Sequence, residues 1–246
     1  MKWFVLALAS VAVLILISPL FVVNPFDILK NFTDREVLYA LWLSAVTSLV
    51  SATAVILIAL PAAYAMAKEL ERPGFAEALL SLPNAMPPVA VGATLLIFFS
   101  RTPIGEFINN IIPIVFSVPG IIVAQVSVSL PLALKPLKSS MKSISDDVLL
   151  MAKTLGCYRL CLLRKVVVPA IENGIKSSFI LALTRAFAEF GASVTLAGAI
   201  KFKTETIPIA IYLNLSSGDV QKTVSLIALS SFVALAFLLA SMRWEE

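Results

Sequence analysis

The chain has 246 residues, of which 59% are hydrophobic and only 14% are charged, and its mean hydropathy is +0.97. The hydrophobic share is above and the charged share is below that of water-soluble domains, which indicates an integral membrane protein. The net charge is +4, but the lysines and arginines form no basic face with interleaved aromatic residues, which argues against a nucleic-acid partner. The chain has no histidine, which excludes a histidine proton relay and leaves a zinc site without ligands. Its two cysteines, Cys157 and Cys161, are expected to be small apolar packing groups.

Six apolar stretches of spanning length follow one another along the chain. A membrane-spanning helix needs roughly 20 mostly apolar residues. We therefore expect an all-α, polytopic integral membrane protein with about six transmembrane helices, in which residues 1–246 form a single domain. The first stretch follows Lys2 as a signal peptide would, but no small-residue cleavage site follows Ser18-Pro19, so we expect it to be retained. The six stretches are residues 3–23, 40–67, 80–99, 119–137, 171–200 and 223–241.

Lysine and arginine are distributed unequally between the two sides that six spans create. With the N-terminus in the cytoplasm, twelve of them fall on the cytoplasmic side and six on the opposite side, and Arg185 stays inside a span. Because positive residues are enriched in cytoplasmic loops, we expect a multi-pass protein of the cell membrane with both termini in the cytoplasm.

The cytoplasmic connection between the fourth and fifth stretches is long, yet it is not apolar enough to span. Ser145 can cap a helix whose first turn carries Asp146 and Asp147, where carboxylates favour the positive end of the helix dipole. Gly156 supplies the flexible stop expected just past a helix end. The sequence therefore predicts a short surface helix and a glycine joint within a cytoplasmic segment at about 140–170.

This segment carries the most specific motif of the chain. Leu150-Met151-Ala152, three residues, Gly156, nine residues and Val166-Val167-Val168-Pro169 resemble the E-A-A, three, G, nine, I-x-L-P signature of binding-protein-dependent ABC importer permeases. The spacing is intact, whereas Leu150 and Met151 stand where the family usually has Glu and Ala. The resemblance implies that Leu150, Met151, Ala152, Gly156 and Pro169 belong to a coupling helix that docks on an ATPase. From the helix alone, an interfacial helix that only anchors to lipid is the rival interpretation.

Further short stretches resemble the permease subunits of molybdate, tungstate and sulfate importers, in the order that this branch shows them. They are Leu60-Pro61-Ala62-Ala63-Tyr64, Leu82-Pro83 with Pro87-Pro88, Thr102-Pro103-Ile104-Gly105, Ser129-Leu130-Pro131-Leu132, Ala188-Glu189-Phe190-Gly191-Ala192 and Thr206-Ile207-Pro208 with Ile211-Tyr212.

The resemblance implies a division of labour among several subunits. A permease of this kind pairs with a second copy of itself, receives a tetrahedral oxyanion from an external binding protein and is driven by two copies of a cytoplasmic ATP-binding subunit. The chain has no phosphate-binding loop. We therefore expect a transport subunit that is not an enzyme and holds no cofactor, with ATP and Mg bound by the partner ATPase.

The substrate and the energy source leave alternatives open. Molybdate or tungstate is the first expectation, and a sulfate or thiosulfate ABC permease is the alternative. A rival class is an ion-coupled secondary transporter, but only Arg185 and Glu189 offer charge deep in a predicted span. A non-transporting membrane scaffold is a third class.

Arg185 and Glu189 lie four residues apart, on one helical face, with Ser193 one turn further. In one interpretation Arg185 contributes positive potential to an anion pathway while Glu189 holds its guanidinium. In the other, which we favour, the pair clamps two helices together without touching substrate.

Small hydroxyl side chains form a stripe of helical period in the second stretch. Ser44, Thr47, Ser48 and Ser51 occupy positions i, i+3, i+4 and i+7. Close packing between helices is the default interpretation, and a pore lining for an anion is the alternative. The same two alternatives hold for the polar residues of the fourth stretch, Gln125 and Ser129. Prolines that bend or break helices can form gates, and the candidates are Pro61, Pro87, Pro88 and Pro131.

Overall fold

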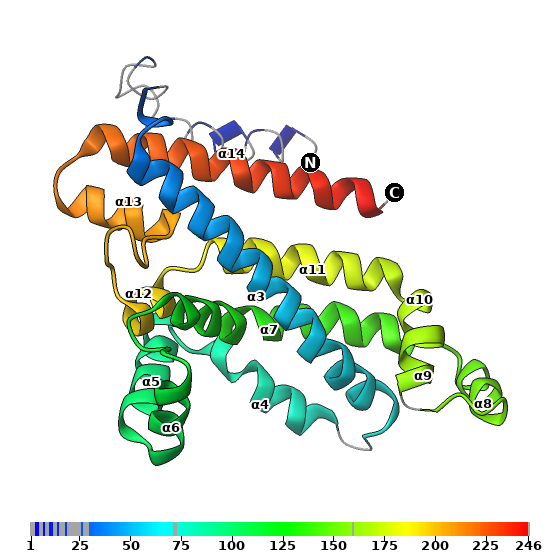
Figure 1. Cartoon of the computed structure of the whole chain (residues 1–246). Coiled ribbons are helices and arrows are strands. Elements are labelled where there is room, and N and C mark those ends of the chain that lie inside the picture. The colour runs from blue at the N-terminus through cyan, green and yellow to red at the C-terminus, as the bar shows by residue number, and fades with distance from the viewer. Residues whose placement is uncertain are drawn as a thin grey trace. The chain divides into compact units, whose positions relative to one another are not determined.

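The computed structural model describes residues 30–70, 73–158 and 160–245, together with isolated positions nearer the N-terminus. Over these residues the chain is helical and contains no strand, so the predicted all-α class is confirmed (Figure 1). The helices are α3 (Arg35–Lys68), α4 (Pro73–Ala85), α5 (Pro88–Arg101), α6 (Pro103–Ile111), α7 (Val118–Lys142), α8 (Asp146–Thr154), α9 (Leu160–Leu162), a π-helical turn (Leu163–Val167), α10 (Val168–Ala170), α11 (Glu172–Phe187), α12 (Gly191–Ala197), α13 (Ile207–Ser216) and α14 (Val220–Glu245).

Three of these helices, α3, α7 and α14, are long and apolar enough to cross a membrane. They confirm the predicted spans at 40–67, 119–137 and 223–241. Counting each of two bent helix pairs as one further span raises the number to five among the described residues. The predicted span at 3–23 lies outside them, apart from isolated positions.

The apolar stretches predicted at 80–99 and 171–200 do not form single straight helices. The first is divided between α4 and α5, which meet at 104°. Pro87 and Pro88 lie at this bend, where the missing N–H groups of proline interrupt helical hydrogen bonding. The second is divided into α11 and α12. At its other end, α11 meets the helical segment Leu160–Ala170 at 85°. Pro61 and Pro131, in contrast, remain inside the continuous helices α3 and α7.

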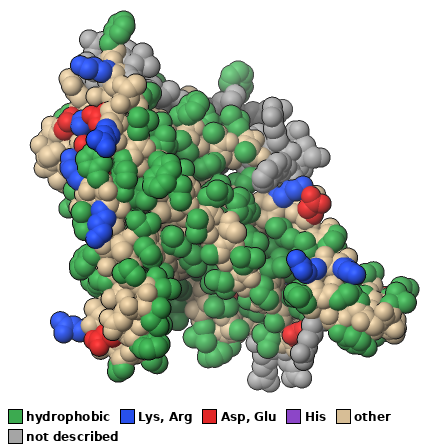
Figure 2. Space-filling view, viewed as in Figure 1, with side chains coloured by type: hydrophobic (Ala, Val, Ile, Leu, Met, Phe, Trp, Pro, Cys, Tyr) green, Lys and Arg blue, Asp and Glu red, His purple; other side chains and the backbone are tan. Residues whose placement is uncertain are grey.

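The chain divides into two compact units, one of residues 1–43 with 199–235 and the other of residues 44–198 with 236–246. In the larger unit α7 is central, and it contacts α4, α5, α11 and α12. Its buried side chains are mostly aliphatic, including Ile121, Ala124, Val128, Leu134 and Leu137. Outward-facing side chains are mostly hydrophobic as well (Figure 2), as a helix bundle in lipid requires.

Two glycines allow α5 and α12 to approach at backbone distance. A Cβ on Gly92 would lie 2.6 Å from the Ala192 carbonyl oxygen, and one on Gly191 would lie 2.9 Å from Pro88 Cβ. Small residues at such contacts are typical of helix packing in membranes. They fix α12 against the start of α5.

Candidate functional site

The coupling segment begins with a capped helix, α8. The Ser145 hydroxyl accepts a hydrogen bond from the Asp147 backbone N–H at 3.2 Å, and α8 ends at Thr154, just before Gly156 with φ of +82°. The predicted helix and glycine joint are therefore confirmed as structure. The positive φ explains the glycine, because L-residues with a side chain rarely adopt this conformation.

One side of α8 faces the protein and the other is unpartnered in this chain. Leu149 and Ala152 are buried, while Leu150, Met151 and Leu155 are exposed. The two positions at which the motif departs from the family's usual letters thus carry apolar side chains on the outer face. A soluble partner can bury such a face in a groove.

The inner end of α8 is fastened to the end of α3. Lys68 Nζ donates to the Ile144 carbonyl and to Asp146 Oδ1, both at 2.7 Å. Nearby, Glu77 of α4 forms an ion pair with Lys138 of α7. Pro169, the last motif residue, lies in the short helix α10 and is exposed. Lys68 therefore joins the start of α8 to the end of α3.

The cysteines do not behave as predicted. Cys157 and Cys161 form a disulfide with their Cα atoms 5.3 Å apart, so the expectation of two free apolar packing groups is wrong. Four residues of separation allow the two thiols to meet because the chain turns between Gly156 and α9. The covalent link thus ties Cys157, the residue after Gly156, to Cys161 in α9.

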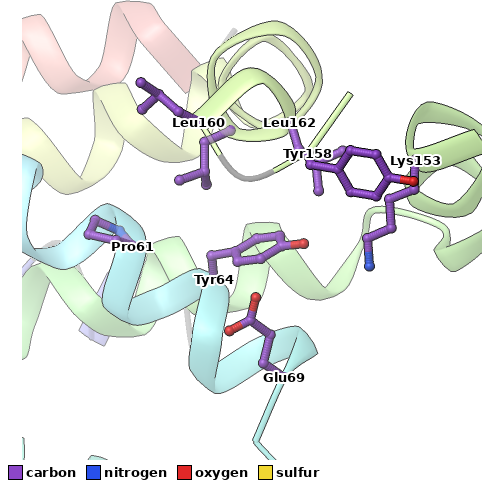
Figure 3. Close-up of a pocket in the computed structure, with 8 residues that line it drawn as sticks. Pro61, Tyr64, Glu69, Lys153, Tyr158, Leu160 and Leu162 are labelled. Carbon is purple, nitrogen blue, oxygen red and sulfur yellow. The ribbon is translucent and has the colours of Figure 1, made fainter. Parts of the chain in front are cut away.

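A pocket of about 430 Å³ lies between the end of α3 and this joint (Figure 3). Figure 3 shows the polar ends of Tyr64, Glu69 and Lys153 turned toward a common space. A neighbouring pocket of about 340 Å³ shares these three residues and extends to the start of α8. The lining of the first pocket is Pro61, Tyr64, Glu69, Lys153, Tyr158, Leu160, Leu162 and Leu163.

The hydroxyl stripe of α3 faces α7. Ser51 Oγ donates to Gln125 Oε1 at 2.8 Å, and Gln125 Nε2 donates to Thr47 Oγ1 at 3.3 Å. All three side chains are buried, as are Ser44 and Ser48. The structure thus brings Thr47, Ser51 and Gln125 together in one contact between α3 and α7. Ser129 is also buried on α7, and its Oγ has no hydrogen-bond partner among the described residues.

Arg185 and Glu189 form an ion pair at a helix break. Arg185 Nη1 lies 2.6 Å from Glu189 Oε2, and Glu189 Oε1 accepts a hydrogen bond from the Ala192 backbone N–H at 2.8 Å. The Glu189 side chain is 1% exposed and that of Arg185 is 25% exposed. The prediction that Ser193 lies one turn further on the same helix is wrong, because α11 ends at Phe187 and α12 begins at Gly191.

The Glu-Phe-Gly-Ala stretch therefore has a structural explanation. Glu189 satisfies an N–H group at the start of α12, where helix N-termini lack internal acceptors. Gly191 allows the close approach to Pro88 at the start of α5. Pro88, the predicted gate residue, is exposed and marks the bend between α4 and α5.

The family of binding-protein-dependent transport system inner membrane components matches residues 59–243. The chain belongs to this family. It is a permease of the molybdate and sulfate branch of ABC importers. The predicted family membership and transport class are confirmed.

Several relatives of the permease cover most of its length. It is 28% identical to the probable transport system permease protein NifC of Clostridium pasteurianum, over 98% of this chain and 88% of that one. It is 34% identical to the molybdenum transport system permease protein ModB of Mycobacterium tuberculosis, over 71% and 67%. It is 26% identical to the sulfate transport system permease protein CysW of Escherichia coli, over 99% and 88%.

A solved structure shares the fold of the permease. In the crystal structure of a bacterial alginate ABC transporter in complex with its alginate-bound periplasmic protein, one chain superposes with a TM-score of 0.70 at 17% identity. The match covers 98% of the permease and 88% of that chain.

The smaller unit of the permease holds an ionic cluster around the buried Glu36 that the sequence did not reveal. Glu36 Oε1 accepts hydrogen bonds from Lys201 Nζ and Asn214 Nδ2, both at 3.0 Å, and its Oε2 lies 3.2 Å from Lys222 Nζ. Lys222 also pairs with Asp34 at 3.0 Å. Lys201, Asn214 and Lys222 are more than 160 residues from Glu36 in the sequence. In the sequence, the two lysines indicated only the orientation of the chain in the membrane. The only sign of this cluster in the sequence was that its carboxylates lie close to the ends of predicted loops.

Glu205 completes this cluster. It is fully buried, and its Oε2 accepts a hydrogen bond from the Phe202 backbone N–H at 2.9 Å. Burial raises the pKa of Glu205, and the nearby Glu36 carboxylate raises it further. The pKa of Asp34 is lowered, first by the hydrogen bond from the Glu36 backbone N–H and also by Lys222. No group of three His, Cys, Asp or Glu suited to a metal occurs in the part of the chain that the structure describes.

Proposed function

We propose that the permease carries a tetrahedral oxyanion inward, molybdate or tungstate in first place, with the energy supplied by ATP hydrolysis in a separate subunit. Membership of the ABC importer family supports the coarse function. The observation that carries the proposed coupling is α8, a capped helix with an exposed apolar face and a base fastened to α3. Similarity to both ModB and CysW leaves sulfate as the competing substrate.

In this proposal two copies of the permease form one pathway, and both termini of each copy lie in the cytoplasm. Two copies of the ATPase bind ATP and Mg and grip α8 through Leu150 and Met151, while Gly156 serves as the joint. Nucleotide-driven closure of the ATPases then moves α3 through Lys68 and opens the pathway to the external binding protein. That binding protein performs most of the substrate selection.

Within the pathway we assign different roles to the two charged residues of the fifth predicted span. Both carboxylate oxygens of Glu189 are engaged, so we propose that it is a positioning residue. Arg185 is the partly exposed member of the pair, and this exposure leads us to prefer contact with the anion over the clamp between helices that the sequence favoured. Packing remains our first interpretation for Thr47, Ser51 and Gln125, because their hydrogen bonds join α3 to α7.

Competition uptake tests the substrate. Vesicles containing the permease, its ATPase and its binding protein are loaded with ATP on the side of the ATPase. Labelled molybdate is added on the opposite side, together with unlabelled tungstate or sulfate. We expect tungstate to compete at concentrations similar to those of molybdate, and sulfate to compete poorly. Uptake that prefers sulfate would overturn the substrate assignment but keep the class.

A further inference from the structure

We infer that α6 is an anchor that lies in the membrane interface with its outer face in lipid. This inference goes beyond the transport function, because α6 contributes none of the residues assigned to coupling or to the pathway. The segment Pro103–Ile111 lies between two predicted spans, where the sequence predicted only a connection.

The inner face of α6 is fixed to α5. Thr102 Oγ1 accepts a hydrogen bond from the Gly105 backbone N–H at 3.0 Å, and Pro103 occupies the first turn, where its missing N–H costs nothing. A Cβ on Gly105 would lie 1.9 Å from the Phe98 carbonyl oxygen, so only glycine permits this contact. At the other end, Asn109 Oδ1 accepts hydrogen bonds from the Ile114 and Val115 backbone N–H groups. These contacts define which face of α6 is turned toward α5.

The outer face of the fixed helix is a hydrocarbon stripe. Ile104, Phe107 and Ile111 occupy positions i, i+3 and i+7, and they are 68%, 66% and 65% exposed. None of these side chains can donate or accept a hydrogen bond. The polar Glu106 lies outside the stripe, since it precedes Phe107 by one residue and points about 100° away around the helix. An apolar stripe that faces away from its own protein needs a non-aqueous environment.

Lipid is the environment that the neighbouring surface favours. α5, which packs on α6, belongs to a bent helix pair that is long and apolar enough to cross a membrane, and it exposes Val89 and Ile97. The stripe thus adjoins a helix that has an apolar surface of its own, which fits a lipid environment. Arg101, at the end of α5, is exposed and can reach phosphate groups at the membrane boundary. A short helix with one apolar face and polar flanks is typical of segments that lie in the interface.

Tryptophan quenching tests this placement in the full-length permease. The native Trp3, Trp42 and Trp244 are replaced by Phe, and Phe107→Trp is compared with Glu106→Trp as the matched control. The proteins are reconstituted in phosphatidylcholine vesicles brominated either near the head groups or near the bilayer centre. We expect the Phe107→Trp variant to be quenched more by shallow bromine than by deep bromine, and to be protected from aqueous iodide on the order of threefold relative to the control.

Two results would overturn the inference. The first is equal iodide quenching of both variants without bromolipid quenching, which would place the stripe in water. The second is iodide protection of the Phe107→Trp variant that appears only when the external binding protein is added, which would make the stripe a protein-docking surface. If Phe107→Trp fails to assemble, Ile111→Trp on the same stripe serves with the same control and the same outcomes.

Discussion

Glu189 binds Arg185 through one carboxylate oxygen at 2.6 Å and uses its other oxygen to cap α12 at the Ala192 backbone N–H. One buried side chain thus both positions the cation and stabilises the break between α11 and α12. These two tasks can be separated by substitution, because glutamine keeps an acceptor oxygen but loses the charge.

Glu189→Gln should lower the free energy of unfolding by roughly 1.5–3 kcal/mol, the range for a hydrogen bond to a charged group. Glu189→Ala should lower it further, because α12 then also loses its capping acceptor. Urea unfolding of the purified complex measures both, with the exposed Glu106→Gln as the control. Equal stability of Glu189→Gln and the parent would show that the ion pair contributes nothing.

Arg185→Gln should raise the oxyanion concentration needed for half-maximal uptake, because the partly exposed guanidinium then no longer attracts the anion. Arg185→Lys keeps the positive charge, so its half-maximal oxyanion concentration should stay close to that of the parent. Uptake is measured over a range of oxyanion concentrations in complexes of verified composition. An unchanged concentration dependence in Arg185→Gln would leave the residue as a clamp between helices.

Met151→Gln on the exposed face of α8 should weaken ATPase binding by about 1–3 kcal/mol, because an apolar anchor is lost from the interface. Lys153→Gln is the matched control, since Lys153 is exposed on roughly the opposite side of the same helix. Affinity is measured by titrating the ATPase into permease held in detergent. A larger loss in Lys153→Gln than in Met151→Gln would assign docking to the other side of α8.

Gln125→Leu should destabilise the α3–α7 contact by roughly 0.6 kcal/mol, the mean for side-chain hydrogen bonds in membrane helices. Ser129→Ala should have almost no effect, because the Ser129 hydroxyl has no hydrogen-bond partner among the described residues. Thermal unfolding and uptake are both recorded. If uptake falls in Gln125→Leu while stability is unchanged, the polar group belongs to the pathway and not to packing.

Glu205 should make the stability of the permease depend on pH. Its pKa is raised above the ordinary 4.5 in the folded protein, chiefly by burial, so the folded state holds the proton more tightly than the unfolded state. Its contribution is therefore fully present below pH 4.5 and is lost as pH rises through the raised pKa. Facing groups are Glu36 and Tyr39 of α3 and Lys201 of the same loop, with Lys222 of α14 bound to Glu36.

Glu205→Gln should remove this part of the pH dependence, because glutamine mimics the protonated acid at every pH. The unfolding midpoint is measured from pH 4.5 to pH 8, with Glu106→Gln again as the control. Asp34 acts in the opposite direction, since its lowered pKa means that its contribution is lost as pH falls. A parent protein and Glu205→Gln variant with parallel pH profiles would contradict the role of the buried acid.

The sequence predicted features that depend on local pattern. Continuous apolar runs identified α3, α7 and α14, and Ser145 with Gly156 marked both ends of the coupling helix. Pro87 and Pro88 indicated a bend in the third apolar stretch, whereas the break at Glu189 was not predicted, because it lies inside an apolar run without a proline. The Glu-Phe-Gly-Ala stretch stood out in the sequence as a family motif, but the reason for its glycine depends on the close approach of Gly191 to Pro88.

The remaining features depend on contacts between distant residues. Glu36 meets Asn214 and Lys222 across more than 170 positions of sequence, which no local pattern encodes. The disulfide between Cys157 and Cys161 was not predicted for a different reason, because two cysteines four residues apart can equally be small apolar packing groups. The stripe on α6 was readable in principle from Ile104, Phe107 and Ile111, but its direction depends on Gly105 facing α5.

Uptake with the energy source as the variable tests most directly whether a partner ATPase drives this permease through α8. Vesicles containing the permease and the binding protein, with or without the ATPase, are compared with ATP, without ATP, and under an imposed proton or sodium gradient. We predict accumulation of labelled molybdate only when both ATPase and ATP are present, with strong loss in Met151→Gln. Accumulation driven by an ion gradient without the ATPase would contradict the proposed coupling and identify a secondary transporter instead.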